Sequence, residues 1–150
     1  MTTRLSLKAI AERLDTDPLI NPAPGTVRCG TSFDHDYITA FTTAMPAIWV
    51  VGQRVVRIDD GRGWSGHNRQ NLRVEVALRL VVRRYADGVI DAEAALADLE
   101  TKTIDRLHGW TPTGAAEHLT VVSSQDGPAY ETQLTLDLIL GCRATHVGGS

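Results

Sequence analysis

A glycine-rich loop is the first stretch of this 150-residue chain whose residue types could do chemistry. Residues 61–66, GRGWSG, match the GxGxxG pattern of nucleotide-binding turns. That pattern requires a strand before it and a helix opening at its end, because the helix N-terminus receives the phosphates. Residues 71–85 follow instead, and they alternate with the two-residue period of a strand. We therefore interpret residues 61–66 as part of a hairpin loop rather than a nucleotide site.

A second candidate is the cluster Asp34-His35-Asp36, which places two carboxylates beside an imidazole. Adjacent side chains of a helix point about 100° apart, so these three would not converge on one metal ion. Acidic residues near the positive start of a helix explain the two aspartates more simply. Neither Cys29 nor Cys142 has a neighbouring histidine, and their wide separation favours two buried thiols. The sequence thus predicts no catalytic residue, no metal site and no cofactor, and we expect a protein that is not an enzyme.

The composition indicates one globular domain over residues 1–150. Hydrophobic residues make up 43% of the chain and charged residues 22%, which is enough apolar material for a core. No apolar run approaches the roughly 20 residues of a membrane span. Charged residues interrupt the apolar stretch at the N-terminus, so we expect no signal peptide and a cytoplasmic origin.

Charge is unevenly distributed along the chain. Residues 51–84 hold eight arginines and three acidic residues, a net of +5, whereas the other residues hold seven basic and fifteen acidic, a net of −8. Such asymmetry suits a nucleic acid, an acidic partner or another copy of the chain; the plainer alternative is a solvated strand face. Trp64 lies in the polar loop among arginines, which is typical of a contact hot spot. We predict these interface residues: Arg54, Arg57, Arg62, Trp64, Arg69, Arg73 and Arg83.

The clearest predicted element is a helix within residues 91–112. Asp91 is a good N-cap, because its carboxylate can accept hydrogen bonds from the first free backbone N–H groups. Gly109 can adopt the left-handed conformation that closes a helix, and Pro112 prevents the helix from resuming. Apolar positions recur at three- and four-residue spacing along one face, at Leu96, Leu99, Thr103, Ile104 and Leu107.

Two alternating segments, residues 71–85 and 130–142, flank this helix and are predicted to be strands. In the first of them one face carries Val74, Val76, Leu78, Leu80 and Val82. Residues 119–124 should pair antiparallel with the second segment as a hairpin.

Shorter patterns complete the expected fold. They predict helices over residues 5–14 and 32–44, a short strand over 26–29, and a central strand over 47–51 that residues 54–58 extend. Together the elements predict an α+β fold: a mostly antiparallel or mixed, twisted sheet of four to five strands, with about three helices packed mainly on one face. Residues 143–150 are expected to form a flexible tail.

The ordered elements resemble the tail terminator, or tail-to-head joining, proteins of long-tailed bacteriophages. The resemblance rests on the helix end at Arg13-Leu14, the PAIWV strand at residues 46–50, and the polar loop through Gln70 into the following strand. Its most specific part is the helix end LHGWTP, residues 107–112, followed by the final hairpin. This pattern covers nearly the whole chain.

The resemblance implies a structural virion protein that forms a ring, expected to be hexameric, at the head-proximal end of the tail. Such a ring stops polymerisation of the tail tube protein and presents the surface that joins the head. It implies three partners: further copies of the chain, the tube protein and a head or neck connector protein, with DNA passing through the lumen without specific binding. The virion tail, assembled in the host cytoplasm, is the implied location. Two alternatives stay open, a head–tail connector or neck completion protein, and a nucleic-acid or ligand-binding domain that uses the arginine-rich hairpin of residues 54–84.

Overall fold

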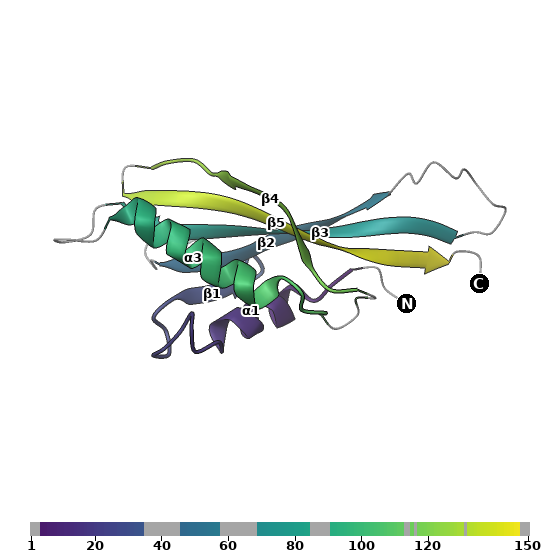
Figure 1. Cartoon of the computed structure of the whole chain (residues 1–150), viewed down its shortest axis with the longest axis horizontal. Helices are drawn as coiled ribbons and strands as arrows, with labels where there is room; N and C mark the ends of the chain where they lie inside the picture. Colours follow the sequence, from purple (N-terminus) through teal and green to yellow (C-terminus); the bar gives the residue numbers. More distant parts are fainter. Residues whose placement is uncertain are drawn as a thin grey trace.

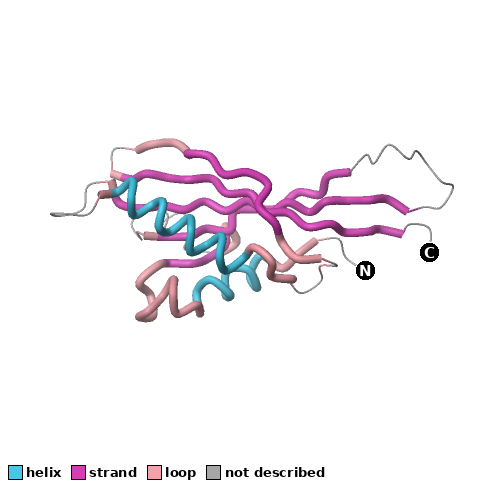
Figure 2. The backbone as a smooth tube through the Cα atoms, viewed as in Figure 1, coloured by secondary structure: helices cyan, strands magenta, loops and turns pink. Residues whose placement is uncertain are grey.

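The computed structural model describes residues 4–34, 46–57, 69–84, 91–112, 115, 117–130 and 132–147. A five-stranded mixed sheet in the order β1-β2-β3-β5-β4 forms its centre, with two helices packed against one face (Figures 1 and 2). In chain order the elements are α1 (Leu7–Asp15), β1 (Arg28–Thr31), β2 (Ala47–Arg57), β3 (Arg69–Arg83), α3 (Ala92–Leu107), β4 (Thr120–Asp126) and β5 (Gln133–Val147). Among these described strands only β1 and β2 pair in parallel; the other neighbours are antiparallel.

Both helices begin and end at residues with clear capping chemistry. The Ser6 hydroxyl accepts a hydrogen bond from the Ala9 amide at the start of α1. Asp91 accepts from the amides of Glu93 and Ala94 at the start of α3, as the sequence predicted. Gly109 follows α3 with a φ of +84°, in the left-handed region where a side chain would be strained.

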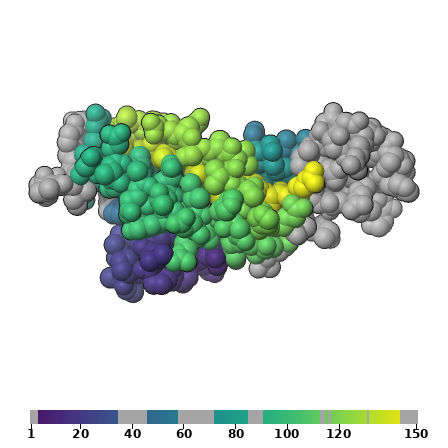
Figure 3. Space-filling model, in the orientation of Figure 1, coloured from purple at the N-terminus to yellow at the C-terminus, as the bar shows by residue number. Residues whose placement is uncertain are grey.

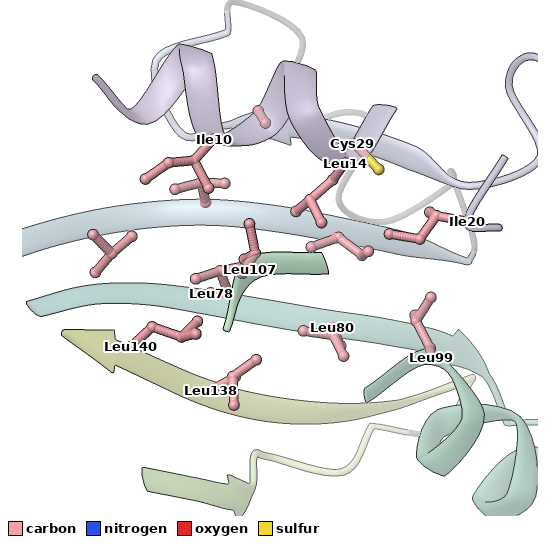
Figure 4. Packing of buried hydrophobic residues seen from close by; sticks show 14 of the residues in the cluster. Ile10, Leu14, Ile20, Cys29, Leu78, Leu80, Leu99, Leu107, Leu138 and Leu140 are labelled. Atoms are coloured by element: carbon pink, nitrogen blue, oxygen red, sulfur yellow. The ribbon is translucent and has the colours of Figure 1, made fainter. Parts of the chain in front are cut away.

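The apolar sides of the helices and the sheet share one core. Alternate residues of β3 and β5 face the helices, and their side chains meet those of α1 and α3 (Figure 4). The predicted inward row of β3 is confirmed, since all five of its members are buried, and so are four of the five predicted apolar positions of α3, all except Ile104. Fully buried side chains in this core include Ile10, Leu14, Leu80, Leu107, Leu138 and Leu140.

A small polar cluster links α1 to the end of α3. The Arg13 guanidinium lies 4.6 Å from the centre of the Trp110 ring, and its Nε donates to the Arg106 carbonyl at 2.9 Å. The Arg106 Nε in turn lies 2.7 Å from the Asp17 carboxylate. Trp110 is partly buried and packs against the core.

Part of the sheet extends past both helices. Residues 54–57 of β2, 69–75 of β3 and 141–147 of β5 pair with one another, and we call this three-stranded segment the arm (Figure 1). Near its base β2 and β4 each contain one extra residue. The register of β2 skips Val51 between Val50 and Gly52, and that of β4 skips Val122 between Val121 and Ser123. Such bulges bend a strand and increase its twist.

Two expectations differ from the structure. About three helices were predicted, whereas the described residues contain two; the expected helix over 32–44 falls largely on residues 35–45, which lie outside the described part of the chain. A flexible tail was expected from residue 143, but β5 continues to Val147 because the first residues of β3 provide it with an antiparallel partner. The sheet and the α+β class agree with the prediction.

Candidate protein-contact surface

The face of the sheet turned away from the helices carries a row of charges. Its positions alternate with the core residues along β2, β3 and β5, so the sequence period of two separates charged from apolar side chains. We call these residues the charged face: Arg54, Arg73, Glu75, Arg79, Asp137 and Arg143.

Glu75 organises the arm end of the charged face. Its side chain is only 2% exposed, yet it is a carboxylate. The Arg54 Nε lies 2.6 Å from one of its oxygens and the Arg73 Nε lies 2.9 Å from the other. Two arginines therefore compensate the cost of burying one carboxylate, while their own side chains stay 71% and 43% exposed. Glu75 thus fixes the positions of two exposed cations.

Arg79 and Asp137 form a second pair, nearer the centre of the sheet. The Arg79 Nε donates to Asp137 Oδ1 at 2.7 Å, and its Nη2 donates to Oδ2 at 3.0 Å. This two-point contact matches the planar fork of arginine to the planar carboxylate. It joins β3 to β5 and leaves no net charge at this position.

Arg143 makes the arm end of the charged face positive. It is exposed and lies directly opposite Arg73 in the β3–β5 register. Like charges in opposed positions repel, unless an acidic group lies nearby. Arg54 and Arg73 contact Glu75, and Arg143 lies beside Arg73; we call these three arginines the arginine patch.

A second surface lies over α3 and β4, which are green on the face seen in Figure 3, and β4 forms an edge of the sheet. Residues 91–126, which include both elements, hold seven acidic and two basic residues. The Ser124 hydroxyl donates to Glu100 Oε2 at 2.7 Å and ties the helix to the strand. Glu93 lies two turns before Glu100 on the same stripe of the helix, and Asp126 lies on the same side of β4 as Ser124. We call Glu93, Glu100 and Asp126 the acidic edge.

The structure places the predicted interface residues in different surroundings. Arg54 and Arg73 come together on Glu75, as described above. Arg57 is exposed on the opposite, helix-side face of the arm, opposite Leu72. Arg83 lies at the other end of β3, about 33 Å from Arg73 at the usual rise of a strand.

The remaining predicted positions are less defined. Arg69 begins β3, while Arg62 and Trp64 lie outside the described residues, as does the glycine pattern at residues 61–66.

Four residues of the charged face were missed by the sequence reasoning: Glu75, Arg79, Asp137 and Arg143. Arg143 was assigned to a flexible tail, because the alternating pattern of β5 becomes polar after Cys142. The signal that could have found all four is the pairing of β3 with β2 and β5, which a single sequence does not contain.

The geometry offers contact chemistry rather than reactive groups. Among the described residues no cluster of three or more His, Cys, Asp or Glu side chains could hold a metal ion. Burial raises the pKa of the Cys29 thiol to about 12, with a smaller contribution from Asp15 in the same direction. Burial also raises the pKa of Cys142, with Glu117 adding to the effect. Both thiols are therefore poor nucleophiles at neutral pH.

The described part of the chain has helices on one face of a sheet and paired charges on the other, an arrangement that offers surfaces for contact with other proteins. The family comparison makes this specific. Residues 1–136 match the model of the phage tail terminator protein family, and the chain therefore belongs to that family. A search of curated proteins finds none that matches the chain.

Membership of this family gives the chain a structural role in the bacteriophage tail. The family is not typically enzymatic, and a phage tail protein is part of the virion. In the described part of the chain no helix is long and apolar enough to cross a membrane.

Proposed function

We propose that copies of this chain form a closed ring, expected to be hexameric, on the head-proximal end of the tail tube. The ring stops further addition of tube protein and presents the surface that the head or neck joins. DNA passes through its lumen without specific binding. The observation that carries the proposal is the family match over residues 1–136.

The structure supports a mechanism based on contact surfaces. A ring repeats one contact between two different patches until it closes. The arginine patch on the arm and the acidic edge over α3 and β4 are two such patches, of opposite charge. The ring of this chain stops tube growth sterically. One face of the ring binds the last ring of tube protein, and its other face does not accept tube protein.

The direct test is polymerisation of purified tube protein with and without this chain. We expect tubes that elongate freely alone and stay short when the chain is present, with one ring-shaped cap at one end in negative-stain images. Tubes of unchanged length without caps would contradict the proposed function. Caps on isolated head connectors but not on tubes would favour the connector or neck completion role instead.

A separate DNA-binding measurement tests the nucleic-acid alternative. Arg54 and Arg73 contact Glu75, and Arg79 pairs with Asp137, so part of the positive charge on this face is compensated within the chain. Binding of duplex DNA that fell by orders of magnitude over a few-fold rise in salt would support that alternative.

A further inference from the structure

The described arm and the described α3–β4 region carry opposite net charges. The arm holds five arginines and one glutamate, a net of +4. Residues 91–126 hold seven acidic and two basic residues, a net of −5. Two surfaces of opposite charge attract one another, whereas two surfaces of the same charge repel.

The arginine patch is held in place before any partner arrives. Arg54 and Arg73 contact Glu75 through their Nε atoms, at 2.6 and 2.9 Å. A guanidinium has more N–H donors than one such contact uses, so these exposed arginines can bind a second carboxylate while Glu75 fixes their position. A patch that is already ordered loses less side-chain freedom on binding.

One carboxylate of the acidic edge is also held in place, by a single hydrogen bond. Ser124 holds Glu100 to β4, and Glu93 and Asp126 extend the acidic surface on either side. In the described part of the chain none of these three carboxylates forms an ion pair. Three carboxylates without an ion pair complement a patch of three arginines, two of which contact Glu75.

The two patches lie on different parts of the molecule. The arginine patch spans β2, β3 and β5 on the face of the arm turned away from the helices. The acidic edge lies over α3 and β4, and β4 forms an edge of the sheet. A contact between these two patches is heterologous, which repeats around a ring, whereas a two-fold contact would oppose like charges. Exposed Val121 and Val122 on β4 and partly exposed Val55 and Val56 on the arm add apolar area.

We infer that the arginine patch of one copy binds the acidic edge of the next copy. The inference rests on the proposed ring and names the contact that builds it. A second copy is the fitting occupant because this chain itself carries the complementary carboxylates.

Two charge variants and their mixture test this contact. The first variant, Arg54→Gln with Arg143→Glu, leaves Arg73 on Glu75. The second, Glu93→Lys with Asp126→Lys, leaves Glu100 on Ser124. Lys8→Glu and Glu12→Lys serve as matched controls, because these α1 side chains are 84% and 65% exposed and lie outside both patches. Self-association is measured at low ionic strength by light scattering over a concentration series.

We expect each patch variant alone to self-associate at least about tenfold more weakly than the wild-type chain. An equimolar mixture should associate again, because an alternating ring places each reversed patch against a complementary one. Recovery on mixing would also show that both variants are folded. The two controls should associate like the wild-type chain.

Wild-type association by both variants, or no recovery on mixing, would overturn the inference. A wild-type chain that stays monomeric at low ionic strength would also overturn it. The tube assay would then still test the proposed function, because it detects a ring that forms only on the tube. Conversely, rings that behave as expected here but never cap a tube would support this contact and contradict the proposed function.

Discussion

Glu75 shows how one residue can serve both stability and contact. A buried carboxylate is tolerated when cations compensate it, and here two arginines do so. Glu75→Gln keeps the shape of the side chain but removes its charge. We expect it to lower the free energy of unfolding by about 1–3 kcal/mol, measured by urea denaturation.

Glu12→Gln is the matched control for this change. Glu12 also pairs with a basic residue, but the pair is exposed and its atoms are 4.0 Å apart. An exposed pair contributes about 0–1 kcal/mol, so little change is expected. Equal effects of the two substitutions would contradict the compensating role of the two arginines at Glu75.

Cys29 gives a pH dependence whose sign follows from its burial. The pKa of the thiol rises from 9.0 to about 12 in the folded chain. Between these values the unfolded chain has lost this proton and the folded chain has kept it. Stability is therefore unaffected below pH 9 and falls as the pH rises toward 12. We expect a loss of up to about 1 kcal/mol per pH unit in that range.

The measurement compares urea midpoints of the wild-type chain and Cys29→Ala at about pH 8 and about pH 10. Cys142 is present in both chains, so its own raised pKa cancels in the comparison. The substitution should reduce the alkaline loss of stability. An identical alkaline loss of stability in both chains would mean that groups other than Cys29 cause it.

At the scale of elements, the end of α3 depends on one backbone conformation. Gly109 has a φ of +84°, and a Cβ atom added to this residue would meet no other atom within 4 Å. Gly52 has equally open space but no positive φ. Gly109→Ala should therefore cost about 1–2 kcal/mol through backbone strain.

Gly52→Ala is its control and should be neutral or slightly stabilising, by up to about 1 kcal/mol, because alanine restricts the unfolded chain. Thermal unfolding of both variants checks the prediction. A similar loss in the two would mean that φ is not the cause.

Elements with local signals were predicted well from the sequence. Asp91, the apolar spacing and Gly109 lie within one stretch, and α3 begins and ends where they indicated. The end of β5 was wrong because residues 143–147 need β3 as a partner, which no local pattern reveals.

The candidate surface was only partly predictable for the same reason. Arg54 and Arg73 were named individually from the charge distribution. Their meeting on Glu75 depends on the β2–β3 register beyond the bulge at Val51. Arg143 lies beside them on β5, a strand that the sequence pattern predicted to end at residue 142.

At the scale of the whole molecule, a single core connects the sheet to both helices. Leu138 is fully buried in its middle, whereas Val121 on β4 is 37% exposed. Leu138→Ala should cost about 2–5 kcal/mol, and Val121→Ala less than about 1 kcal/mol.

Because the core is shared, we expect helix signal and tryptophan fluorescence to change in one transition in both variants. Circular dichroism and fluorescence recorded on the same urea series test this. Separate transitions for the two signals would show that α1 and α3 do not depend on the same core.

The extra residues Val51 and Val122 have a consequence for curvature. They lie in the two strands on either side of the central pair β3 and β5, near the level where the arm begins. Each lengthens its strand by one residue relative to its partner, so together they set the angle between the arm and the body. In a ring built from contacts between the arginine patch and the acidic edge, that angle sets the rotation from one subunit to the next. Deleting either valine would reduce the angle, and particle images should then show rings with a different number of subunits.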